Sequence, residues 1–126
     1  MKRFVSFILV ILMITALVGC GVEKIDPTIP AIAECLGLEI EEPVFFEMIE
    51  AIDGKQYENG KIEIYQFDKN DAAYEKVITT GYEMTFGDYV ISFKATAYND
   101  GFVLYLNDEV ENPNDIIEAF ENIRFN

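Results

Sequence analysis

The sequence contains no histidine and no tryptophan, and beyond its apolar amino-terminal segment it has a single serine, Ser92. Without histidine, Ser-His-Asp triads, His-ligated zinc and imidazole general bases are excluded. Ser92 lies in an alternating strand pattern, not in the G-x-S-x-G sequence that presents a nucleophilic serine. The eight glycines are scattered and form no phosphate-binding loop. We therefore expect a protein that is not an enzyme and that uses no cofactor.

Basic residues are scarce relative to acidic ones. Lys2 and Arg3 precede every acidic residue, so the chain from Cys20 onward carries 7 Lys and Arg against 23 Asp and Glu, a net charge of −16. This charge repels nucleic acid and anionic lipid head groups, which excludes nucleic acid as a partner. A cationic partner, a divalent cation or a simply solvated surface are compatible with it. The hydrophobic content of 51% is sufficient for a packed core.

The amino-terminal segment has the pattern of a secretory signal peptide. Lys2 and Arg3 are followed by residues 4–18, an uncharged and mostly apolar run of fifteen residues. A membrane-spanning helix needs about 20 such residues, so this run is too short to span. A basic start, a short apolar region and a small residue before the cleavage point are typical of export signals. We predict that residues 1–19 are a signal peptide.

The end of this segment carries a second motif. Leu17-Val18-Gly19-Cys20 resembles the lipobox of bacterial lipoproteins, which has a branched apolar residue three positions before an obligatory cysteine. The resemblance implies cleavage between Gly19 and Cys20 and a diacylglyceryl group on the Cys20 thiol. The two acyl chains of this group provide the stable anchoring that a single chain cannot. We therefore expect a lipid-anchored protein on the extracytoplasmic face of the cell membrane, attached through Cys20.

The expected chemical state of the second cysteine, Cys35, depends on the modification of the first. A thioether at Cys20 would leave Cys35 as a thiol at the edge of a helix's apolar face, where cysteine behaves as a small hydrophobic side chain. A disulfide between the two cysteines is the alternative, because an exported protein meets an oxidising environment. Without a histidine to activate it, a nucleophilic role for Cys35 is disfavoured.

Residues 20–25 form a short tether, and residues 26–126 are long enough for a single domain. Apolar residues at helical spacing predict three helices. Their expected caps are Asp26 for the first, Asp68 or Asn70 for the second, and Asn112 for the third.

Strand patterns and turn residues predict two hairpins. The expected strands are residues 44–52, 61–67, 91–98 and 102–106. In the second of these, Ile62 and Ile64 face one way and Tyr65 and Phe67 the other, so both faces are covered or one carries an aromatic patch. The expected fold class is α+β, an antiparallel sheet of about four strands with the three helices packed on one face.

Tyrosine is abundant, with seven residues, and it is favoured at protein interfaces. We take Tyr65, Tyr98 and Tyr105, all on expected strands, as candidate recognition residues. Ordinary cross-strand packing is the alternative for tyrosines at these positions.

Acidic residues offer two weaker possibilities. Asp68-Lys69-Asn70-Asp71 has the spacing that begins an EF-hand calcium loop, but Ala72 and Ala73 follow and the loop glycine is missing. A helix cap explains this segment better. A pair of carboxylates could perform glycosidase-type chemistry, yet among 23 acidic residues some pair lies at a suitable separation by chance. We predict no metal site and no catalytic residue.

Residues 46–55 and 61–68, with the closing helix around 116–120, resemble small lipoproteins of Gram-positive bacteria. The resemblance implies an anchored domain with a hairpin after the anchor, and it transfers no activity. The leading hypothesis is a non-enzymatic, lipid-anchored binding or accessory domain that meets a protein or another envelope component. The alternatives are a phage-type superinfection-exclusion or hydrolase-inhibitor lipoprotein, and third a carboxylate-based hydrolase.

Overall fold

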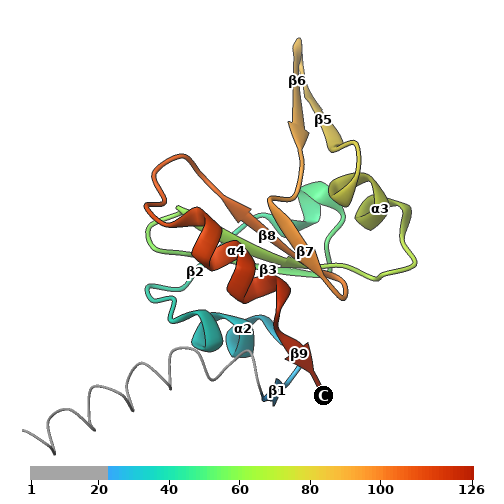
Figure 1. Ribbon diagram of the computed structural model, residues 1–126. Coiled ribbons are helices and arrows are strands. Elements are labelled where there is room, and N and C mark those ends of the chain that lie inside the picture. Colours follow the sequence, from blue (N-terminus) through green and yellow to red (C-terminus); the bar gives the residue numbers. More distant parts are fainter. Residues whose placement is uncertain (1–22) are drawn as a thin grey trace, which may run out of the picture.

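The computed structural model describes residues 23–126 (Figure 1). The predicted signal peptide, the lipobox and Cys20 lie outside the described residues. Within them, the helical elements are α2 (Ile29–Leu36), α3 (Ala72–Ile78), α4 (Pro113–Glu121) and the 3-10 helix η2 (Phe46–Ile49). The strands are β1 (Lys24–Ile25), β2 (Glu42–Pro43), β3 (Asp53–Tyr57), β4 (Ile62–Gln66), β5 (Tyr82–Phe86), β6 (Tyr89–Phe93), β7 (Ala97–Asn99), β8 (Phe102–Leu106) and β9 (Arg124–Phe125).

The main sheet is antiparallel and has five strands in the order β2-β3-β4-β8-β7. Strands β5 and β6 form a separate hairpin, and β1 pairs with β9 in parallel. The α+β class and the three α-helices are therefore confirmed within the described residues. The expected number of about four strands is too low, because the two-residue β2 adds to one edge of the main sheet.

Two predicted strands differ from the observed ones. Residues 44–52 contain η2 and a left-handed Glu50 (φ 62°), and the strand begins only at Asp53. Apolar residues three apart suit a 3-10 turn as well as a short strand, and the sequence pattern did not separate the two. The predicted strand 91–98 is divided between β6, which pairs with β5, and β7, which pairs with β8.

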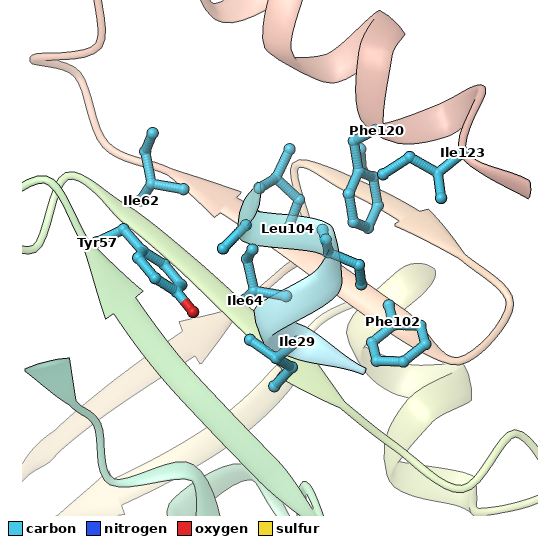
Figure 2. Packing of buried hydrophobic residues seen from close by; sticks show 11 residues of the cluster. Ile29, Tyr57, Ile62, Ile64, Phe102, Leu104, Phe120 and Ile123 are labelled. Carbon is cyan, nitrogen blue, oxygen red and sulfur yellow. The ribbon is translucent and has the colours of Figure 1, made fainter. Parts of the chain in front are cut away.

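One face of the sheet packs against α2 and α4. Ile64 and Leu104 are opposite each other on β4 and β8, and both are fully buried under side chains such as Ile29 and Phe120 (Figure 2). The periodic apolar residues predicted for the first helix do face this core. The buried residues of this first core are Ile29, Ile32, Ala33, Tyr57, Ile62, Ile64, Ala97, Phe102, Leu104, Phe120 and Ile123.

The opposite face is covered as well. Tyr65, Phe67 and Val103 project from the central strands into a second core, which also contains Tyr74 and Val77 of α3 and Ile49 of η2. The expectation that all helices pack on one face is therefore wrong. Because β4 and β8 carry apolar side chains at consecutive positions, both of their faces need cover from water.

Helix caps lie one to three residues beyond some of the predicted positions. Thr28, not Asp26, caps α2, and its Oγ1 accepts a hydrogen bond from Ala31 N at 3.3 Å. Asp71, the last residue of the acidic segment, caps α3 by accepting from Ala73 N at 2.9 Å. The segment thus serves the start of a helix, although neither Asp68 nor Asn70 is the cap itself.

The two ends of the described chain lie together. Asn126 N donates to Ile25 O at 2.9 Å, and Asn126 Nδ2 donates to Asp26 Oδ1 at 3.0 Å. The β5–β6 hairpin projects at the opposite end of the molecule, at the top of Figure 1. The hairpin is therefore remote from β1, where the described residues begin.

We expect Phe102→Ala to lower the free energy of unfolding by about 3–5 kcal/mol, because Phe102 is buried in the first core and its loss leaves a cavity. The matched control is Phe45→Ala, which removes a side chain that is 79% exposed and should change stability by at most about 0.5 kcal/mol. Urea unfolding of the purified protein checks both. Equal effects of the two substitutions would contradict this assignment of the core.

Candidate functional site

The three candidate tyrosines project from one face of the main sheet. Tyr65 and Tyr98 are both paired with Val103, on its two sides, and Tyr105 lies two residues beyond Val103 on β8. Because side chains two residues apart on a strand share a face, all three tyrosines lie on the side of the second core. The register thus brings the three predicted residues to the same face.

Their environments on that face differ. Tyr65 is 4% exposed, and its hydroxyl donates a hydrogen bond to the Glu63 carboxylate. Gly54 is opposite Tyr65, and a Cβ there would lie only 2.9 Å from Tyr65 Cδ1, so the glycine makes room for the ring. The Phe93 ring packs between Tyr65 and Tyr105, with its centroid 5.3 Å from each. Tyr65 is therefore a core residue.

Tyr98 is the candidate that remains accessible. It lies on β7, an edge strand of the main sheet, and its side chain is 51% exposed. Tyr105 is half-buried beneath Phe93. Packing against Phe93 of the separate β5–β6 hairpin accounts for two of the three tyrosines, and sequence alternation alone did not distinguish them from the third.

Three tyrosine hydroxyls donate hydrogen bonds to glutamates in the described residues. The partners are Tyr57 with Glu41 Oε1 at 2.8 Å, Tyr82 with Glu50 Oε2 at 2.7 Å, and Tyr65 with Glu63. Burial, then the glutamate hydrogen bond, raises the pKa of Tyr57 and of Tyr65 above the ordinary value of 10. For Tyr82, the hydrogen bond to Glu50 is the main cause of a raised pKa.

The β5–β6 hairpin is a second candidate surface, and its first strand was not among the strands predicted from the sequence. The register places three apolar cross-strand pairs on one face, namely Tyr82–Phe93, Met84–Ile91 and Phe86–Tyr89. The pairs on the opposite face are Glu83–Ser92 and Thr85–Val90. The strands are joined by Gly87-Asp88, with Gly87 at φ 60°, the sign that a two-residue hairpin turn requires. Period-two alternation in residues 82–86 was the available signal.

The apolar face of this hairpin begins in the core and continues into solvent. Tyr82, Met84 and Phe93 pack against the second core. Farther along the ribbon, Tyr89 is 76% exposed, and Ile91 and Phe86 are also exposed. The structure therefore leaves the outer half of an apolar strand face without cover from the described residues.

Apolar and acidic residues lie close to the base of the hairpin. The helix η2 contacts β5, and its residue Met48 and the preceding Phe45 are exposed. Glu47 and Glu50 belong to the same short segment. The hairpin itself carries Glu83 and Asp88. The exposed apolar face is thus adjacent to negative charge.

No charged side chain among residues 23–126 is buried, and no group of His, Cys, Asp and Glu there is arranged to hold a metal ion. In the same range, no helix is long and apolar enough to cross a membrane.

Cys35 packs against the first core from α2, as expected of a small hydrophobic side chain. The structure records Cys35 as disulfide-bonded, whereas a thioether at Cys20 predicts a thiol there. The chain has one other cysteine, Cys20, outside the described residues. A thioether at Cys20 and a disulfide to Cys20 exclude each other, so the two uses of this sulfur are alternatives.

The chain matches no protein-family model, and comparison with curated proteins and with solved structures likewise gave no match. The resemblance to small lipoproteins of Gram-positive bacteria therefore remains a prediction.

We expect the folded protein to lose stability as the pH rises above about 10. Tyr57 and Tyr65 keep their protons in the folded state, whereas unfolded tyrosine ionises near its ordinary pKa of 10, so ionisation favours unfolding. Their contribution to stability is complete below that pH and declines above it. Thermal unfolding measured at a pH of about 9 and about 11 checks this expectation.

Two variants separate this effect from general alkaline damage. Tyr65→Phe removes a titrating group and should show a smaller loss between the two pH values, whereas Tyr98→Phe, at an exposed position, should behave like the unaltered protein. An identical alkaline loss in Tyr65→Phe and the unaltered protein would argue against a role for Tyr65.

Proposed function

We propose that this chain is a non-enzymatic, lipid-anchored binding domain on the extracytoplasmic face of the cell membrane, accessory to another envelope component. The lipobox-like Leu17-Val18-Gly19-Cys20 supports the anchor. The observation that carries the binding role is the β5–β6 hairpin, whose apolar face extends from the core into solvent.

A bare apolar strand face is unfavourable in an isolated protein. Exposed apolar surface costs about 25 cal/mol per Å², and an exposed strand edge invites aggregation. A two-stranded ribbon that extends beyond its core is also only marginally stable. A binding role explains why the apolar alternation continues beyond the core to Ile91 and to the pair Phe86–Tyr89, because a partner would cover these exposed side chains.

The position of the hairpin suits a partner that is not the chain's own membrane. Lys24, the first residue of β1, follows Cys20 by four positions. A lipid anchor at Cys20 would therefore hold the β1–β9 end close to the bilayer. The hairpin lies at the other end of the molecule (Figure 1). In this orientation its apolar face is directed toward components outside the membrane.

We expect Cys20→Ser to abolish labelling by radioactive palmitate and to release the protein from the membrane fraction, because the substituted residue cannot form the thioether. Cys35→Ser is the matched control and should retain both the label and the membrane association. Membrane fractionation with palmitate labelling in the bacterial host measures both. An unlabelled wild-type protein whose intact mass includes residues 1–19 would refute the anchor.

The binding role predicts a stable association in the cell. After formaldehyde crosslinking and mild detergent extraction, the full-length protein should migrate as a complex with a defined envelope component. Migration as a monomer before and after crosslinking would contradict the proposal. Recovery of a hydrolase that loses activity in the complex would favour the hydrolase-inhibitor alternative.

A further inference from the structure

The base of the hairpin is held in a fixed position. Phe93 packs between Tyr65 and Tyr105, and the Tyr82 hydroxyl donates to Glu50 of the adjoining segment at 2.7 Å. Directly after β6, Ala95 N donates to Val77 O at 2.9 Å. These contacts fix where the exposed outer half of the ribbon lies, which lowers the ordering cost of an association.

The apolar face of the hairpin is small by itself. Five residues per strand span about 17 Å, and the two strands lie about 5 Å apart, so one face presents only a few hundred Å² at most. Stable protein interfaces bury about 800 Å² per partner. An occupant of this face must therefore also contact neighbouring surface, and η2 with the exposed Phe45 and Met48 lies against β5.

This enlarged surface is acidic. The hairpin, the flanking residues 50 and 94, and the two helical elements that contact β5 carry five carboxylates and two lysines. These are Glu47, Glu50, Glu75, Glu83 and Asp88, with Lys76 and Lys94. The whole chain from Cys20 onward has a net charge of −16, so the long-range field has the same sign as the local one.

The charge distinguishes between the possible occupants. A second copy of the chain also carries a net charge of −16, so two copies repel each other. An anionic bilayer repels the domain as well, and an anchor at Cys20 would hold the β1–β9 end near the bilayer, opposite to the hairpin. Nucleic acid is repelled for the same reason. A basic protein is attracted, because complementary potentials accelerate encounter and orient the two surfaces.

Building on the proposed binding function, we propose that the partner is a basic protein that docks on the apolar face of the β5–β6 hairpin. Tyr89, Ile91 and Phe86 contact apolar side chains of the partner. Lysine and arginine residues around that contact face Asp88 in the hairpin turn, Glu47 of η2 and Glu50 directly after η2. Val90, on the opposite face of the same ribbon, remains outside the contact.

The test uses the full-length, anchored chain in intact cells of its native host. A photo-crosslinking phenylalanine analogue replaces Tyr89 on the apolar face, Val90 on the opposite face, or Tyr98 on the edge of the main sheet. All three positions are exposed, at 76%, 62% and 51%, so the analogue should not disturb the fold. Thermal unfolding of each variant tests whether the substitution leaves the fold undisturbed.

We expect irradiation to yield a discrete adduct at Tyr89, at least about tenfold stronger than at Val90, with a protein of isoelectric point above about 9. With that partner purified, Tyr89→Ser and Ile91→Ser should each weaken binding by about tenfold or more, the range found for central aromatic and aliphatic contacts. Val90→Ser should change binding less than about twofold, and added salt should weaken it because the carboxylates are exposed.

The other outcomes separate the two proposals. An adduct at Tyr89 with a lipid, with a second copy of the chain or with an acidic protein overturns this inference. An adduct at Tyr98 without one at Tyr89 also overturns it but leaves the binding function intact. No adduct at any of the three positions, together with monomeric migration after formaldehyde crosslinking, overturns both.

Discussion

The packing of β4 against β8 is the interaction on which the rest of the structure depends. Their register sets Ile64 opposite Leu104 on one face and Tyr65 opposite Val103 on the other, so both faces of the central pair are apolar. Burying such a pair requires cover on two sides. The helices α2 and α4 supply it on one side, and α3, η2 and the base of the β5–β6 hairpin supply it on the other.

The candidate surface is a consequence of that second layer. Phe93 packs against Tyr65 and Tyr105, and Tyr82 packs against the second core. The two strands that carry Phe93 and Tyr82 continue beyond the core with the same alternation. An apolar face that begins as core packing therefore ends in solvent at Tyr89. The core and the proposed recognition surface are two ends of one ribbon, which connects the stability of the fold to the position of the proposed contact.

Sequence periodicity was sufficient for the elements whose pattern has a single interpretation. The first and last helices and strand β4 were predicted close to their observed positions, because their apolar residues recur at spacings typical of one structure. Residues 44–52 could be a strand or a tight helical turn, and the left-handed Glu50 decided the outcome. Residues 91–98 alternate throughout, yet the backbone of Ala95 bonds to Val77 O of α3 and divides the segment between two sheets.

By itself, the sequence determined the excess of acidic over basic residues, the lack of histidine chemistry and, through alternation, which residues of a strand share a face. It also carries the lipobox-like motif on which the proposed anchor depends. Only the tertiary structure decided that Tyr65 is buried, that Tyr98 is exposed and that the face of Tyr89 has no cover among the described residues. The physical reason is that alternation specifies the direction of a side chain, whereas its exposure depends on which distant segments pack over it.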